Sequence, residues 1–212
     1  EKGNPNLNPE ESYQLDAGIH WGNDRLTIQF DPYLNYFPNY IYMNPTPNYY
    51  EGLQWYYYTQ SRVIRCGFEL QADWKILPSL SAEFKGEYLY AEQLSGEKKG
   101  YTLPFSTPWS ADATLRYAFC RKNVGNEGFV AMNMHVTGRQ NNIVPPEKPT
   151  PGYYTLNLTA GKDFAFGERT LRLSLNAENL LNRKYYDHTS FYRLIDVPEP
   201  GRNVALMATF EF

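Results

Sequence analysis

Apolar and polar residues alternate with a period of two along most of the chain. The alternation is cleanest over 169–180 and 201–212, where apolar positions are separated by single polar or small residues. A strand whose two faces meet different surroundings has this period, because successive side chains point to opposite faces. Seven more segments follow the pattern: 11–20, 25–36, 55–74, 79–90, 109–119, 127–138 and 152–162. The sequence therefore predicts nine strands and an all-β fold.

The connections between these strands alternate between short and long. The short turns are 21–24, 75–78, 121–126 and 163–168, and the long loops are 38–54, 91–108, 139–151 and 181–200. Outer-membrane barrels have short turns at one rim and long loops at the other. A soluble sandwich gives no reason for this segregation. The pattern favours an antiparallel transmembrane β-barrel in which the polar strand face, with His20 and His135, lines the lumen.

The composition agrees with a barrel once the alternation is known. The mean hydropathy of -0.60 is typical of soluble domains, but a barrel strand meets lipid only at every second residue. No run of about 18 apolar residues is present, which excludes a helical membrane protein. Aromatic residues gather near strand ends, as in interfacial girdles, although they also favour strands in general.

Charge and cysteine content exclude other classes. The net charge is -3 and no basic cluster occurs, so we expect no nucleic-acid partner. Cys66 and Cys120 are too few for a disulfide scaffold or a metal motif, and we interpret them as packing residues. No phosphate-binding loop, dinucleotide motif or nucleophile elbow is present, and adjacency of Asp187, His188 and Ser190 does not give triad geometry. The sequence predicts no enzyme.

The number of predicted strands, nine, is odd. A sheet of these strands has two unpaired edges, at 11–20 and 201–212. Bacterial barrels close with an even number of strands, and unpaired backbone groups in lipid are costly. No signal peptide opens the chain. We therefore expect residues 1–212 to be the C-terminal portion of a larger barrel, with the remaining N-terminal strands outside this chain.

Short motifs spread over the whole chain resemble those of TonB-dependent receptors. The motifs are Gly3-Asn4-Pro5-Asn6-Leu7-Asn8-Pro9-Glu10, Cys66-Gly67-Phe68-Glu69, Leu103-Pro104-Phe105-Ser106-Thr107-Pro108-Trp109, Asn176-Ala177-Glu178-Asn179-Leu180-Leu181-Asn182-Arg183-Lys184-Tyr185, Pro200-Gly201-Arg202-Asn203 and a C-terminal Phe212. Their order and spacing make the resemblance specific. It implies a barrel of about 22 strands, of which this chain holds about nine C-terminal ones, and Phe210 and Phe212 as the signal read by the barrel assembly machinery.

The resemblance also implies partners and a function. A whole receptor sits in the outer membrane of a Gram-negative bacterium, contains a plug domain, and is driven by the TonB energy-coupling complex through its N-terminal part. It imports a scarce nutrient such as haem, a ferric siderophore, cobalamin or another metal complex, with no intrinsic cofactor. The alternatives from other classes are a passive outer-membrane pore, a structural piece of a barrel, and a soluble glycan-binding β-sandwich.

Two long loops hold the candidate ligand-binding residues. In the last loop, His188, Tyr192 and Arg193 are candidates, because imidazole and phenolate groups can bind a transition metal or an iron chelate. His188 is the candidate metal ligand, although Asp187 and Thr189 could instead serve turn chemistry. In the first long loop, Tyr40, Tyr42, Tyr49 and Tyr50 could stack on a planar ligand. A rigid, proline-rich surface loop is the alternative there.

Overall fold

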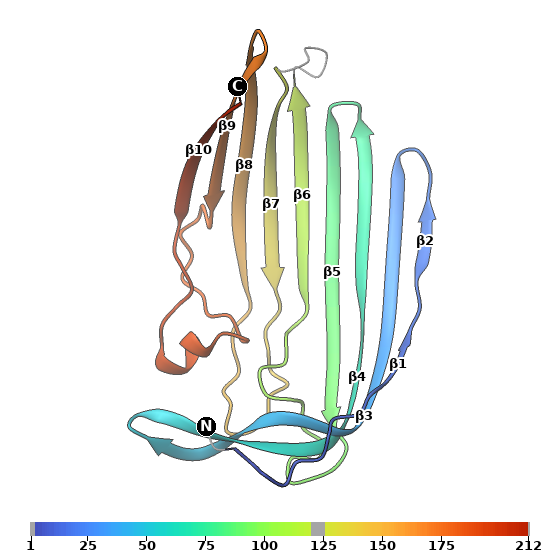
Figure 1. Cartoon of the computed structure of the whole chain (residues 1–212), viewed down its shortest axis with the longest axis vertical. Coiled ribbons are helices and arrows are strands. Elements are labelled where there is room, and N and C mark those ends of the chain that lie inside the picture. The colour runs from blue at the N-terminus through green and yellow to red at the C-terminus, as the bar shows by residue number, and fades with distance from the viewer. Residues whose placement is uncertain (1–2, 120–125, 212) are drawn as a thin grey trace.

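The computed structural model describes residues 3–119 and 126–211, which form one open antiparallel sheet of ten strands. Strands adjacent in sequence pair with one another, except at one edge, where β1 and β2 both pair with β3 (Figure 1). Strand β10 forms the other edge. The strands are β1 (Tyr13–Asp16), β2 (Ile19–Gly22), β3 (Leu26–Tyr50), β4 (Leu53–Leu77), β5 (Leu80–Gln93), β6 (Ser110–Phe119), β7 (Gly128–Thr137), β8 (Tyr153–Phe166), β9 (Arg169–Glu178) and β10 (Asn203–Glu211).

The predicted strand order is confirmed, with the first strand in two pieces. Strands β1 and β2 replace the single strand expected at 11–20, and Ala17 between them still donates its N–H to Pro32 O at 3.1 Å. Helical structure in the described residues is limited to the 3-10 segment η1 (Phe191–Ile195). None of it is long and apolar enough to cross a membrane. Most of the predicted turn 121–126 and the residue Cys120 lie outside the described residues.

The long loop predicted at 38–54 is wrong. Strands β3 and β4 run on through this region and stay paired as far as Tyr50 and Leu53. Only Glu51 and Gly52 connect them, with φ values of 50° and 80°. Positive φ at both central residues matches the twist of a two-residue hairpin. Figure 1 shows that this hairpin bends away from the sheet and crosses beneath the ends of the neighbouring strands.

Prolines explain why the alternation of polar and apolar residues does not reveal the hairpin. Pro38 and Pro45 interrupt the polar and apolar alternation, and proline in a strand usually indicates an edge or a bulge. The pairing of β3 with β4 is irregular at two places, between Phe37 and Tyr40 and between Pro45 and Tyr49. Such bulges bend a strand and increase its twist. They let the hairpin tolerate proline and turn across the end of the sheet.

The pairing register places apolar and polar residues on opposite faces. Thr114 pairs with Asn133, and the next pair along, Leu115 with Met132, points to the other face. One row of cross-strand partners runs through Leu26, Trp74, Ala82, Leu115, Met132, Leu158, Ala177 and Val204. The adjacent row is Glu83, Thr114, Asn133 and Asn157.

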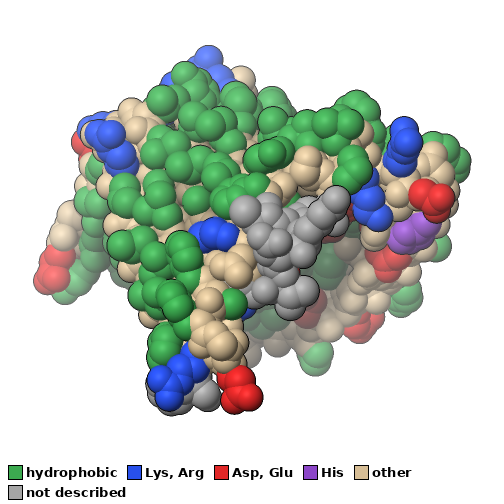
Figure 2. Space-filling model, turned by 90° about the horizontal axis from the view of Figure 1, so that it is seen from above, with side chains coloured by type: hydrophobic (Ala, Val, Ile, Leu, Met, Phe, Trp, Pro, Cys, Tyr) green, Lys and Arg blue, Asp and Glu red, His purple; other side chains and the backbone are tan. Residues whose placement is uncertain are grey.

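The apolar face is largely uncovered. Leu115 is 50% exposed, Met132 47% and Leu206 75%. Viewed end-on in Figure 2, hydrophobic side chains gather over the upper and left parts of the molecule, and most acidic side chains and a histidine lie to the right. Contiguous apolar surface of this extent marks contact with a membrane or a partner. The two-faced strands expected from the sequence are confirmed.

The buried core lies at the long-loop end of the sheet. Tyr42, Val63, Ala91 and Leu103 form its centre, with Phe37 and Tyr40 packed against it. The Tyr42 hydroxyl donates to Gln93 Oε1 at 2.5 Å, and Gln93 Nε2 donates to Thr102 O at 2.7 Å. The core therefore fixes the β3–β4 hairpin against the connection that follows β5.

Candidate functional site

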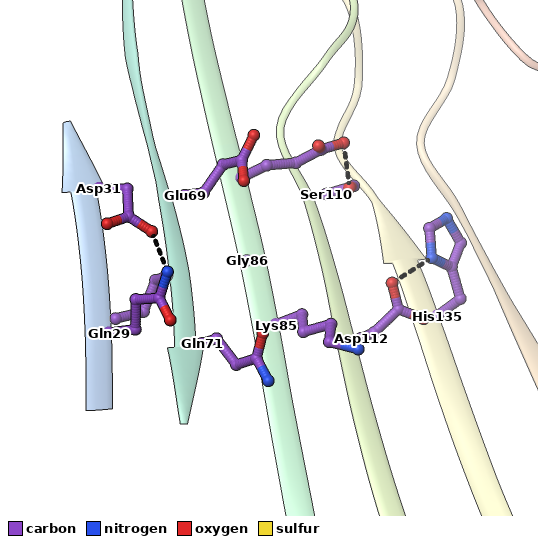
Figure 3. Close-up of a pocket in the computed structure, with 11 residues that line it drawn as sticks. Gln29, Asp31, Glu69, Gln71, Lys85, Gly86, Ser110, Asp112 and His135 are labelled. Carbon is purple, nitrogen blue, oxygen red and sulfur yellow. Dashed lines mark hydrogen bonds and ion pairs between the residues drawn. The ribbon is translucent and has the colours of Figure 1, made fainter. Parts of the chain in front are cut away.

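The polar face of the sheet carries a hollow of about 330 Å³, lined by β3 to β7 (Figure 3). Asp112 lies beside His135, with 3.0 Å between Oδ2 and Nδ1, and the other ring nitrogen is 2.9 Å from Thr137 Oγ1. The charged residues of the lining are Asp31, Glu69, Glu87, Asp112 and Lys85. Carboxylates outnumber the single ammonium, so this surface favours positively charged groups.

A second candidate region lies where three connections between strands meet at a buried carboxylate. Glu147, between β7 and β8, has a fully buried side chain, and Arg193 Nη2 donates to its Oε1 at 2.7 Å. The N–H of Phe105, between β5 and β6, donates to the same oxygen at 3.1 Å. Arg193 Nε also donates to His188 O at 2.6 Å. One carboxylate thus joins segments more than 40 residues apart.

His188 is buried beside this ion pair, with a side chain 1% exposed. Its Nδ1 is 2.7 Å from Thr150 Oγ1, and its Nε2 is 4.0 Å from Glu147 Oε2. Burial, and then the positive charge of Arg193, lower the pKa of His188 to about 4. Burial raises the pKa of Glu147, against the opposing effects of the Phe105 N–H and Arg193. His188 is therefore neutral at neutral pH.

Aromatic contacts extend this cluster to the β3–β4 hairpin. The Phe105 ring lies 4.7 Å from the Phe191 ring and 6.0 Å from the ring of Tyr56 on β4. The Arg193 guanidinium is 5.2 Å from the centroid of the Phe105 ring, within the range of a cation–π contact. The hairpin and the connections after β5, β7 and β9 consequently form one packed unit, which we call the loop cluster.

We expect acid to loosen the loop cluster through His188. When the cluster opens, His188 regains the ordinary histidine pKa of about 6.5, whereas in the closed cluster its pKa is about 4. The open state therefore binds more protons in this window. Stability of the closed state is then lost as the pH falls from about 6.5 to about 4. Glu147 acts in the opposite sense, because its raised pKa makes the closed state bind more protons.

Hydrogen exchange of residues 179–202 in the folded protein tests this pH dependence. After correction for the intrinsic chemical rate, the His188 contribution should speed exchange in wild type as the pH falls from 7 to 5. His188→Gln removes the histidine contribution and should show a smaller acid effect than wild type. An equal acid effect in both proteins would contradict the assignment.

The structure places the predicted ligand-binding residues in different environments. Tyr49, Tyr50 and Tyr192 are exposed, at 65%, 66% and 62%. Tyr40 and Tyr42 belong to the core, with Tyr42 buried. His188 and Arg193 lie together in the loop cluster. Tyr49 and Arg193, far apart in sequence, line one cavity of about 240 Å³ with Glu147 and Tyr186. A binding role for these residues stays a prediction.

The described residues form no metal site around His188. In residues 3–119 and 126–211, no three His, Cys, Asp or Glu side chains come together as metal ligands. The Asp187 carboxylate accepts hydrogen bonds from the Thr189 N–H, at 2.7 Å, and from the Tyr153 hydroxyl, at 3.1 Å. These contacts are the turn chemistry that the sequence offered as the alternative. They also lower the pKa of Asp187, against the effect of burial.

Glu147, Thr150 and Phe105 are the site residues that the sequence did not reveal. Glu147 is the single acid in 139–151, within a run rich in proline, and this isolation was the available signal. Its burial depends on contacts with residues 42 and 46 positions away, which no local pattern contains. Of the proposed assembly signal, Phe210 is 46% exposed on β10, and Phe212 lies outside the described residues.

Comparison with known proteins identifies the family. The family described as TonB dependent receptor-like, beta-barrel matches residues 1–180. Among solved structures, the copper transporter OprC matches 94% of this chain with a TM-score of 0.77 and 19% identity. The ferric preacinetobactin receptor BauA from Acinetobacter baumannii matches 95% with a TM-score of 0.70 and 12% identity. The ferric yersiniabactin uptake receptor FyuA from Yersinia pestis matches 95% with a TM-score of 0.64 and 18% identity.

The matched region is a limited part of each relative. It covers 31% of the OprC chain, 29% of BauA and 28% of FyuA, so this chain spans less than a third of their length. The sheet has the architecture of a section of barrel wall, which defines the class as outer-membrane β-barrel proteins. Within that class, the chain belongs to the TonB-dependent receptors and corresponds to part of their barrel.

Proposed function

We propose that this chain is a section of the barrel wall of a receptor that imports a scarce nutrient across the outer membrane of a Gram-negative bacterium. The observation that carries the proposal is the pairing register, which separates an exposed apolar face from a polar face over the whole sheet. Such a sheet suits a wall with lipid on one side and a water-filled or plugged lumen on the other.

The remaining strands and a plug domain would lie elsewhere in the same polypeptide. Edges β1–β2 and β10 are open in this sheet, and unpaired backbone groups within lipid cost several kcal/mol each. Strands of the rest of the barrel would pair with them. The plug would fill the lumen and contact TonB, which supplies the energy. The barrel assembly machinery would insert the whole barrel into the bilayer, guided by Phe210 and Phe212.

A metal complex is the favoured cargo. OprC is named a copper transporter, BauA a ferric preacinetobactin receptor and FyuA a ferric yersiniabactin uptake receptor. Haem, a ferric siderophore, cobalamin and a copper complex are therefore the candidates to test. The binding surface would be the long-loop end, where Tyr49, Tyr50 and Tyr192 are exposed around the loop cluster. His188 would contribute to a metal site only after the cluster opens, because its ring is buried.

Uptake by cells tests the proposal. The full receptor is expressed in a Gram-negative host without competing receptors, in strains with and without TonB. Each candidate cargo is supplied, and cell-associated iron, cobalt and copper are measured by elemental mass spectrometry against an empty-vector control. We expect one cargo to accumulate only when both receptor and TonB are present. Uptake that is equal without TonB would indicate a passive pore, and no uptake of any cargo would reject import of metal complexes.

A further inference from the structure

Arg65 on β4 projects from the polar face near the place where the hairpin bends across the sheet. Its cross-strand partners are Asn35 on β3 and Ala91 on β5. It lines a cavity of about 360 Å³, within the size range of small-molecule sites. The hairpin residues Tyr40 and Met43, together with 103–107, form other parts of the lining.

Arg65 forms no ion pair in the described part of the chain. It is the single charged residue of this cavity lining, and no hydrogen bond, ion pair or ring contact to it occurs within residues 3–119 and 126–211. Its Nε is fully covered and has no hydrogen-bond partner, and neither has Asn35 Oδ1. Among the described residues, two other arginines are half-buried, and both are partnered: Arg193 pairs with Glu147, and Arg183 stacks on Tyr154.

The Nε of Arg65 has lost water without gaining a partner, which is costly. The planar fork of a guanidinium matches the two oxygens of a carboxylate. The surrounding lining is aromatic and apolar, with Tyr40, Leu89, Leu103 and Phe105. A ligand that fits both features carries a carboxylate on an apolar or aromatic body.

We propose that Arg65 and this cavity form a carboxylate subsite beneath the hairpin. The inference rests on the proposed receptor function and narrows the cargo to compounds with at least one free carboxylate. A carboxylate could reach Arg65 from the cargo or from another part of the receptor polypeptide. We assign the subsite to a carboxylate of the cargo. The experiment distinguishes this from a carboxylate of the receptor polypeptide itself.

Binding of 4-fluorobenzoate to the purified full receptor, followed by ¹⁹F NMR, tests the subsite. The neutral 4-fluorobenzamide has the same size and is the matched probe. Wild type should bind the benzoate more tightly than the benzamide. Arg65→Met should weaken benzoate binding by about tenfold or more, since a hydrogen-bonded charge pair contributes at least that much. Arg65→Lys keeps the charge without the fork and should fall between the two.

Arg62→Met is the control, because Arg62 lies on the same strand and is exposed. It should leave benzoate binding unchanged. Benzoate affinity equal in wild type and Arg65→Met overturns the proposal. Absence of benzoate binding by wild type also overturns it, and a receptor structure with Arg65 paired to the receptor's own Asp or Glu would then identify the second source. The result is independent of TonB, so failure here leaves the uptake test of the proposed function standing.

Discussion

Arg193→Met should open the loop cluster and make the connections after β7 and β9 accessible. The substitution leaves the Glu147 carboxylate, whose side chain has no exposed area, without its counter-charge. Breaking a buried ion pair at one partner costs about 3–5 kcal/mol. The Phe105 ring also loses its guanidinium contact. In the full receptor, limited proteolysis and hydrogen exchange should both report faster opening of residues 138–152 and 179–202.

A double substitution separates the ion pair from simple loss of side-chain volume. Glu147→Gln keeps an oxygen that can accept from the Phe105 N–H and removes the unpaired charge. Combined with Arg193→Met, it should therefore recover part of the lost protection, because an absent pair is less harmful than a broken one. Arg202→Met is the control, since Arg202 is exposed in the same connection. If Arg193→Met behaves like Arg202→Met, the ion pair does not hold the loops.

Gly67→Ala should destabilise the sheet more than the matched substitution Gly86→Ala. A Cβ at Gly67 would stand 2.1 Å from Tyr88 O and 2.7 Å from the Tyr33 hydroxyl. The first of these atoms is backbone and cannot move without disturbing the pairing of β4 with β5. Overpacking of this kind costs typically about 1–3 kcal/mol, and a backbone clash places the expected loss at the upper end or beyond.

The effect is measurable on the full receptor as heat-modifiable migration in gels and as the midpoint of thermal unfolding. Gly86→Ala on β5 is the matched control, because its added Cβ meets the edge of the Phe84 ring at 3.3 Å and stays 3.9 Å from the nearest backbone atom, Ser110 O. Each variant adds one methyl group, and the two positions lie on neighbouring strands. Equal loss of folded protein in both variants would show that Gly67 is not required for the close approach of β4 and β5.

The strand pattern and order could be predicted because both depend on local information. Alternation at Leu171, Leu173 and Leu175 already defines the apolar side of β9, and pairing with β10 in the structure keeps it there. Segregated turn lengths then indicated consecutive antiparallel pairing, which is confirmed. Resemblance to TonB-dependent receptors is confirmed over residues 1–180.

The hairpin and the loop cluster could not be predicted from the same signals. In the hairpin, prolines hid the strand pattern, and the bulges that accommodate them depend on the partner strand. In the loop cluster, Glu147 becomes buried only because Phe105 and Arg193 approach it from two other connections. Tyr42 similarly looked like an exposed loop residue, yet hydrogen bonding to Gln93 holds it in the core.

Site-directed spin labelling of the full receptor in a lipid bilayer tests the central claim most directly. Labels are placed at Met132→Cys on the apolar face and at Asn133→Cys on the polar face, after Cys66 and Cys120 are replaced by serine. Dissolved oxygen concentrates in lipid, whereas a neutral nickel complex stays in water. We predict that oxygen relaxes the label at 132 more strongly and that nickel relaxes the label at 133 more strongly. Strong nickel relaxation of both labels would contradict a barrel wall with lipid on its apolar face.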